Sequence, residues 1–141
     1  MVHELAEFEK APEQCHLTAE QLHTALFDPA PALFGHVATG PDGHLLGYAL
    51  WFRNFSTWEG VHGVYLEDIY VRPEARGTGA GRLLIATLAR ICVERGYQRL
   101  DLQVLDWNPA RDVYTRLGFT HQAEWLPYRL SGAPLHALAS S

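Results

Sequence analysis

The sequence has little of what marks a disulfide-stapled, membrane-spanning or nucleic-acid-binding protein. It has only two cysteines, Cys15 and Cys92, which do not indicate a disulfide framework and fit a reducing compartment. No apolar run approaches the roughly 20 residues that cross a bilayer. Acidic residues outnumber Lys and Arg by 16 to 11, and no basic stripe is present. We therefore expect neither a membrane nor a nucleic acid as a partner, while the acidic balance suits either a cationic substrate or a solvated surface.

Metal-ligand spacing and a targeting pattern are also missing. The eight histidines are scattered without the spacing of a metal site, so no metal is expected. The start, Met1-Val-His-Glu4, has no signal-peptide pattern, which favours a cytoplasmic location. With 141 residues, the chain is long enough to bury a core as one domain over residues 1–141.

What is present is an alternation of helix and strand patterns. Apolar spacing, a capping box at Thr18-Ala-Glu-Gln21 and Gly or Pro breakers predict helices near 5–8, at 18–27, within 77–95 and at 109–117. Strands are expected at 34–39, 45–52, 64–71 and 99–105, with one or two more in 121–130. Residues 53–63 are expected to form a longer connection, and the tail 131–141 to fray. These patterns predict an α/β fold.

The segment 64–71 is the clearest strand. Strict alternation would place Tyr65, Glu67, Ile69 and Val71 on one face, and Val64, Leu66, Asp68 and Tyr70 on the other. The helical crossover that follows implies that this strand and the one at 99–105 are parallel neighbours. Because the hairpin before them is antiparallel, the sheet is expected to be mixed and mostly antiparallel.

A glycine-rich loop, Gly77-Thr-Gly-Ala-Gly81, follows this strand and opens a helix. Exposed backbone N–H groups at a helix N-terminus suit a phosphate or pyrophosphate. A P-loop would need Lys and then Ser or Thr after the last glycine, but Arg82-Leu83 stands there. A Rossmann fingerprint would begin directly after the strand with GxGxxG spacing, whereas residues 72–76 intervene and the spacing is GxGxG.

The full pattern from Arg76 to Gly81 resembles the R/Q-x-x-G-x-G/A acyl-CoA signature of the GNAT N-acetyltransferases. A second match to that family is Asn108, Ala110 and Tyr114 followed by Leu117-Gly-Phe119. Four segments resemble, more specifically, the diamine (spermidine/spermine) N-acetyltransferase branch: Glu4–Lys10, Tyr65-Leu-Glu-Asp68, Val71-Arg-Pro-Glu74 and Leu105-Asp-Trp-Asn108. The similarity runs from about Glu4 to Leu130. It implies a single-domain GNAT fold that uses acetyl-CoA to acetylate a primary amine, as a homodimer.

The resemblance also implies the site residues. Glu67 would take the amine proton through water and Tyr114 would protonate the CoA thiolate. Acyl-CoA would be held by Ile69, Tyr70, Val71, Arg76, Gly77, Thr78, Gly79, Ala80, Gly81, Arg82, Asn108, Ala110, Arg111 and Tyr114. The amine would be held by Phe8, Glu9, Glu67, Asp68, Asp101, Leu102 and Gln103.

The sequence also allows other roles for these residues. Glu67 could instead be a structural carboxylate in an ion pair, and Tyr114 a packing residue with a satisfied hydroxyl. Asp68 falls on the face opposite Glu67, so both would touch one ligand only if the strand bends or a dimer mate intervenes. No Ser–His–Asp or Cys–His arrangement is discernible, which favours direct transfer over an acyl-enzyme.

Two departures from the family leave rival functions open. Members normally carry a strand and the start of a helix before the segment at Glu4, so the usual first strand is expected to be missing here. The stretch from Asn108 to Tyr114 is one residue shorter than usual, with the deletion beside Pro109. The rivals are a non-catalytic acyl-CoA-binding regulatory module and a protein or peptide N-acetyltransferase; the identity of the amine stays open.

Overall fold

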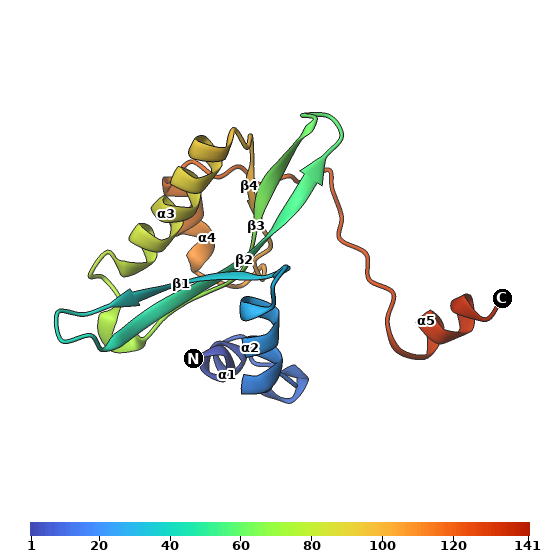
Figure 1. Cartoon of the computed structure of the whole chain (residues 1–141), viewed down its shortest axis with the longest axis horizontal. Helices are drawn as coiled ribbons and strands as arrows, with labels where there is room; N and C mark the ends of the chain where they lie inside the picture. Colours follow the sequence, from blue (N-terminus) through green and yellow to red (C-terminus); the bar gives the residue numbers. More distant parts are fainter. The chain divides into compact units, whose positions relative to one another are not determined.

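The structure is a computed structural model that describes residues 1–141 and contains two compact units, Met1–Leu105 and Asp106–Ser141. The first unit holds a mixed sheet and three α-helices, and the second holds two short helices (Figure 1). The α-helices are α1 (Val2–Phe8), α2 (Ala19–Phe27), α3 (Ala80–Arg95), α4 (Ala110–Arg116) and α5 (Gly132–Ala139). The strands are β1 (Phe34–Thr39), β2 (Leu45–Ser56), β3 (Val61–Val71) and β4 (Leu100–Leu102). The α/β class is confirmed, while a single domain over 1–141 stays a prediction.

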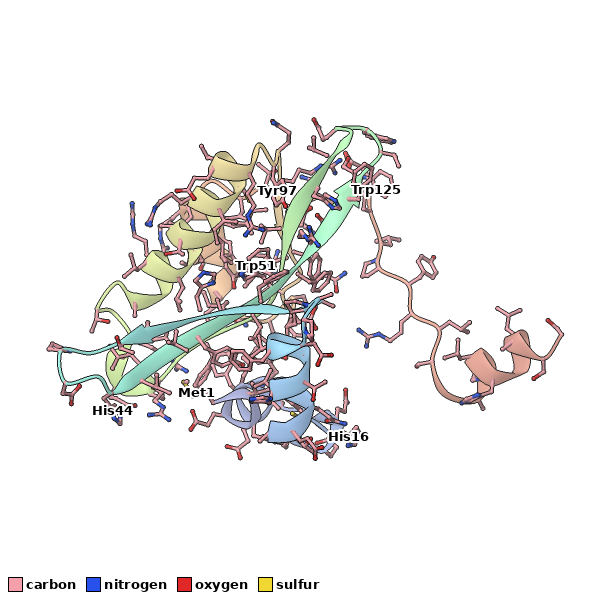
Figure 2. All side chains as sticks on the ribbon, viewed as in Figure 1. Met1, His16, His44, Trp51, Tyr97 and Trp125 are labelled. Atoms are coloured by element: carbon pink, nitrogen blue, oxygen red, sulfur yellow. The ribbon has the colours of Figure 1, made fainter.

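The sheet has the order β1-β2-β3-β4, with two antiparallel pairings and then a parallel one between β3 and β4. This confirms the crossover predicted through α3. Helix α3 covers one face of the sheet, and α1 and α2 cover the other (Figure 1). Trp51, which is 2% exposed, lies in the core between the sheet and α3, the α3 core (Figure 2). The opposite core contains Leu5, Tyr48, Leu50 and Tyr70.

Local signals placed the helix ends correctly. At the start of α2, Thr18 Oγ1 accepts a bond from the Gln21 N–H at 3.1 Å, and Gln21 Oε1 accepts one from the Thr18 N–H at 2.9 Å. This is the predicted capping box. Helix α3 ends at Gly96, whose φ of 71° is a left-handed conformation that favours glycine. Both predictions are confirmed.

The strict alternation predicted for β3 is wrong because the strand contains a β-bulge. On β2, Leu50 pairs with Asp68 and the next residue, Trp51, pairs with Leu66, so Glu67 is the extra residue. An extra residue reverses the faces of everything that follows it. Val64 and Leu66 before the bulge, and Ile69 and Val71 after it, all pack in the α3 core. Glu67 and Asp68 are therefore not on opposite faces as the alternation suggested.

The boundaries of three strands also differ from expectation. Residues 53–63 were expected to be a connection, but β2 continues to Ser56 and β3 begins at Val61. The two added strand segments pair with each other, and the centres of the Phe55 and His62 rings lie 5.2 Å apart across the pair. Because the segments pair only with each other, their polar residues resembled those of a loop. Strand β4 is shorter than the predicted 99–105. Its ladder with β3 ends at Leu66, where the bulge begins.

The C-terminal predictions fail in two places. Residues 121–130 contain no strand, although their apolar side chains suggested one or two. A strand needs a ladder partner, and the sheet contains only β1–β4. The tail expected to fray from Ser131 instead forms helix α5, which begins at Gly132. The strands predicted at 121–130 and the frayed tail are therefore both wrong.

Candidate active site

The glycine-rich loop presents an uncapped helix N-terminus. Gly77 and Gly79 have φ values of 80° and 91°, and Gly79 is the N-cap of α3 without a side-chain cap. A Cβ at either glycine would meet no heavy atom within 4 Å. The first N–H groups of α3 have no acceptor within the helix. The loop thus offers donors, open space and the positive end of a helix dipole to an anion.

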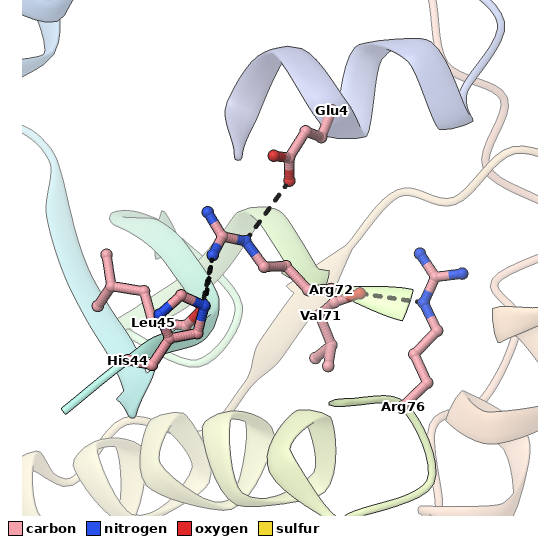
Figure 3. Close-up of polar contacts among 6 residues, drawn as sticks. All are labelled: Glu4, His44, Leu45, Val71, Arg72 and Arg76. Atoms are coloured by element: carbon pink, nitrogen blue, oxygen red, sulfur yellow. Dashed lines mark hydrogen bonds and ion pairs between the residues drawn. The ribbon is translucent and has the colours of Figure 1, made fainter. Parts of the chain in front are cut away.

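The side chain of Arg76 contacts the end of β3 and the aromatic rings of Phe8 and Tyr70. Its Nε donates to the Val71 carbonyl at 3.0 Å (Figure 3). Its guanidinium carbon lies 5.3 Å from the centre of the Phe8 ring and 5.6 Å from that of Tyr70. Arg76 therefore joins the start of the loop to the end of β3 and to helix α1, which carries residues predicted to hold the amine.

Arg72 makes a second set of contacts at the same strand end. Its Nη1 donates to the Leu45 carbonyl at 3.2 Å and lies 3.2 Å from His44 Nε2. Its Nε lies 3.9 Å from a carboxylate oxygen of Glu4 on α1 (Figure 3). Arg72 thereby ties the end of β3 to the β1–β2 turn and to α1. Sequence analysis missed it because its partners are remote in the chain.

Carboxylates gather near the bulge. Asp68 is half-buried and accepts a hydrogen bond from the Tyr48 hydroxyl, with its Oδ2 3.3 Å away. Glu67 is exposed next to it, and Glu9, the C-cap residue of α1, interacts electrostatically with both. The structure thus brings together three of the residues predicted to bind the amine, with Tyr48 as a partner that sequence analysis did not identify.

The environment of these groups favours their neutral forms. The pKa of Asp68 is raised to about 6, first by burial and then by the Glu67 and Glu9 carboxylates, while the Tyr48 hydrogen bond opposes the rise. Burial and then Glu67 raise the pKa of Glu9. The pKa of Tyr48 is also raised, first by burial and then by Asp68. A cation placed here would relieve this repulsion.

Of the three β4-region residues predicted to bind the amine, Asp101 makes a polar side-chain contact in the structure. Asp101 pairs with Tyr65 of β3 and accepts a bond from Asn54 Nδ2 at 3.2 Å. Burial, and then the Glu67 and Asp101 carboxylates, raise the pKa of Tyr65. Leu102 packs in the α3 core instead, and Gln103 is exposed beyond the strand end.

The second unit carries the remaining predicted residues. Asn108 Oδ1 accepts a bond from the Ala110 N–H at 2.9 Å, at the start of α4. Arg111 Nη1 donates to the Asp106 carbonyl at 2.7 Å. Tyr114 lies in α4 and meets Phe119 edge-to-face, with ring centres 5.5 Å apart. Asn108 thus has a local structural role at the start of α4.

No group of three or more His, Cys, Asp or Glu side chains is arranged to hold a metal ion. None of the helices combines the length and apolarity needed to cross a membrane.

Comparison with known proteins decides the family. The model of the acetyltransferase (GNAT) family matches residues 1–119. Thialysine N-epsilon-acetyltransferase of Mus musculus is 38% identical over 150 residues, which cover 99% of this chain and 88% of the relative. The Bos taurus protein of the same name is 36% identical, with the same coverage. The chain belongs to the GNAT acetyltransferase family.

A solved structure shares the fold of this chain. An integron cassette protein from the mobile metagenome of V. cholerae has a TM-score of 0.80 and 28% identity, covering 98% of this chain and 86% of that one. The predicted GNAT fold is therefore confirmed, as are the predictions that the chain is an N-acetyltransferase and that it resembles the diamine N-acetyltransferase branch.

The raised pKa of Asp68 predicts how this GNAT enzyme's stability depends on pH. Because the pKa is about 6 in the fold against an ordinary 3.8, the folded protein binds the proton more tightly. The ionised carboxylate therefore destabilises the fold above about pH 6, and this cost disappears as the pH falls toward 3.8. Asp68→Asn should raise Tm at pH 7 by about 2–6 °C, with the gain shrinking near pH 4.

Thermal unfolding of both proteins across this pH range checks the prediction. Asp106→Asn, which neutralises an exposed carboxylate, is the control and should change Tm little at any pH. A gain for Asp68→Asn that persists undiminished at pH 4, or no gain at pH 7, would contradict the account.

Proposed function

We propose that this enzyme transfers an acetyl group from acetyl-CoA directly to a primary amine of a small polycation. The substrate class is a diamine, a polyamine or a related amino acid such as thialysine. The observation that carries the proposal is the β3 bulge, which brings Glu67 and Asp68 together near Glu9. More than one carboxylate suits a substrate with more than one ammonium group.

The first unit fits acetyl-CoA in two respects. The left-handed glycines leave open space beside the free N–H groups of α3, where the pyrophosphate would bind. In addition, β3 pairs with β4 only from Val64 to Leu66. Its edge from Glu67 to Val71 is therefore available for the pantetheine to pair as an added strand. Acetyl-CoA supplies the acetyl group as a thioester.

Glu67 would remove a proton from the amine. With Lys as a guide, an ammonium of pKa ~10.4 lies ~3.4 units above pH 7, so the neutral amine costs about 4.6 kcal/mol. A positioned base offsets part of this cost. Glu67 is exposed at the bulge, where it can reach substrate or water, while Asp68 and Glu9 would hold ammonium groups.

Tyr114 would give a proton to the departing thiolate. A hydroxyl donor at this point prevents the build-up of negative charge on sulfur. Asn108, Ala110 and Arg111 of the same unit are proposed to contact the donor. These roles rest on the match between segment 108–119 and the family, together with the helix that α4 forms.

Substituting one glycine tests the donor loop. Gly79→Ala places a Cβ in a left-handed residue, at a strain of about 1–2 kcal/mol, and fills space beside the N–H groups. We expect the acetyl-CoA Kd to rise by at least about 10-fold, measured by isothermal titration calorimetry.

Gly43→Ala is the matched control for this loop. Gly43, in the β1–β2 turn, has a φ of 79° and equally open surroundings. It should show the same loss of thermal stability with unchanged affinity for acetyl-CoA. Equal Kd values for Gly79→Ala and the wild type would mean that the loop is not the phosphate site.

The activity itself is tested by thiol release from acetyl-CoA with a panel of amines. Turnover with diamines, polyamines or thialysine supports the proposal. Acetyl-CoA binding without turnover on any amine would instead favour the regulatory module, and turnover confined to peptides would favour the protein N-acetyltransferase.

The assembly and location are part of the same proposal. We propose that the enzyme works as a homodimer in the cytoplasm, as the resemblance to its branch implies. Sedimentation velocity should show a single species of twice the chain mass of 15.8 kDa.

A further inference from the structure

We propose that Tyr48 is a positioning residue of the acetyl-transfer reaction, whose hydroxyl holds the Asp68 carboxylate in its ionised form beside Glu67. This inference deepens the proposed function and rests on it. Nothing in the sequence marks Tyr48, since an aromatic residue between Gly47 and Ala49 in an apolar strand is typical of a core residue.

The geometry gives the Tyr48 hydroxyl a role that packing does not explain. The side chain is 5% exposed and belongs to the core between the sheet and α1. Its ring packs near Tyr70, its direct partner on β3, with ring centres 6.5 Å apart. The hydroxyl donates to Asp68 Oδ2, 3.3 Å away. Phenylalanine would keep the ring contacts, so the hydroxyl acts through Asp68.

The bulge makes this contact possible. Leu50, two residues after Tyr48 and in the same core, is the direct partner of Asp68. Tyr48 therefore reaches Asp68 along the diagonal of the ladder, a distance that a long side chain spans. Because Glu67 is the extra residue, Asp68 turns to the Tyr48 side of the sheet. Without the bulge, the hydroxyl and the carboxylate would lie on opposite faces.

The charges around Asp68 explain why it needs a donor. Glu67 on the same strand and Glu9 from α1 both disfavour its ionised form, and so does burial. The hydrogen bond from Tyr48 of β2 instead favours the ionised form of Asp68. Cys15, from the segment after α1, also interacts with Tyr48. Loss of the hydroxyl should therefore leave Asp68 protonated over a wider pH range, so that it binds an ammonium less well.

The test compares Tyr48→Phe, Asp68→Asn and the double variant with the wild type. The readout is kcat/KM for a diamine from about pH 5 to about pH 9, with acetyl-CoA saturating. Since the same amine is used throughout, its own ionisation cancels in the ratios of variant to wild type. Tyr97→Phe is the control, because it removes the hydroxyl of a partly buried tyrosine elsewhere in the unit.

We expect the acid limb of the Tyr48→Phe profile to move up by about one pH unit, with the KM for acetyl-CoA unchanged. In the Asp68→Asn background, removing the Tyr48 hydroxyl should have no further effect. A purely structural role would lower kcat/KM by the same factor at every pH and in both backgrounds, which would overturn the inference.

A measurement that needs no activity separates this inference from the proposed function. The carboxyl carbon of Asp68 can be titrated by ¹³C NMR in the wild type and in Tyr48→Phe. The wild type should titrate near pH 6 and the variant higher. Identical titrations would overturn the role of Tyr48 even in an active enzyme. A wild type that acetylates no amine would instead refute the proposed function, whatever the titrations show.

Discussion

Tyr114→Phe is expected to lower kcat by about 10²–10⁴-fold, the usual contribution of a positioned general acid. The substitution removes only the hydroxyl. The edge-to-face contact between the rings of residues 114 and 119 should survive, so α4 should keep its structure. The affinity for acetyl-CoA should stay within about 3-fold of wild type if the hydroxyl acts in the transition state alone. Steady-state thiol release and calorimetry on the same preparation check both values.

Tyr128→Phe is the control for this substitution. It removes the hydroxyl of another tyrosine in the same unit, one whose side chain is 93% exposed. It should leave both kcat and affinity unchanged. If Tyr114→Phe lost affinity while kcat stayed near wild type, Tyr114 would be a packing or binding residue and the general acid would have to be sought elsewhere.

Glu67→Gln is expected to lower kcat/KM at pH 7 by about 10²–10⁴-fold. Glutamine has nearly the same size and can occupy the bulge, but it cannot accept the amine proton. Without a base, the variant depends on the fraction of free amine in solution. Its kcat/KM should therefore rise about tenfold per pH unit toward the amine pKa of ~10.4.

Two comparisons make the Glu67 result specific. Glu59→Gln removes an exposed carboxylate at the tip of the β2–β3 hairpin and should be silent. Asp68→Asn should mainly raise the KM for the amine, because we assign Asp68 to binding. A fully active Glu67→Gln enzyme would show that Glu67 is a structural carboxylate, the alternative that the sequence left open.

Features that depend on neighbours in the chain could be predicted from the sequence. The capping box at Thr18, the glycine cap at Gly96 and the short helix before Gly118 each follow from residues within a few positions. The parallel pairing of β3 and β4 followed from the helix between them. The glycine loop could also be placed, because its pattern stands between a clear strand and a clear helix.

Features that depend on pairing across the sheet could not be predicted from the sequence. A bulge of one residue at Glu67 leaves no mark in the apolar pattern of 61–71, yet it decides which carboxylates meet. Tyr48 and Asn54 contact Asp68 and Asp101 from another strand, at separations of 20 and 47 residues. The apolar pattern at 121–130 misled for the same reason, since it carries no information about a ladder partner.

The most direct test of the account is the ratio of kcat/KM for a diamine to that for the monoamine of the same chain length. Both would be measured with acetyl-CoA at neutral pH, and the product identified by mass spectrometry. Asp68 and Glu9, the carboxylates other than the proton acceptor Glu67, should favour the diamine by at least about 10-fold. Each charge-assisted contact contributes about 1.5–3 kcal/mol. Equal values for the two amines, or no acetylated amine at all, would contradict the central claim that the bulge of β3 builds a polycation site.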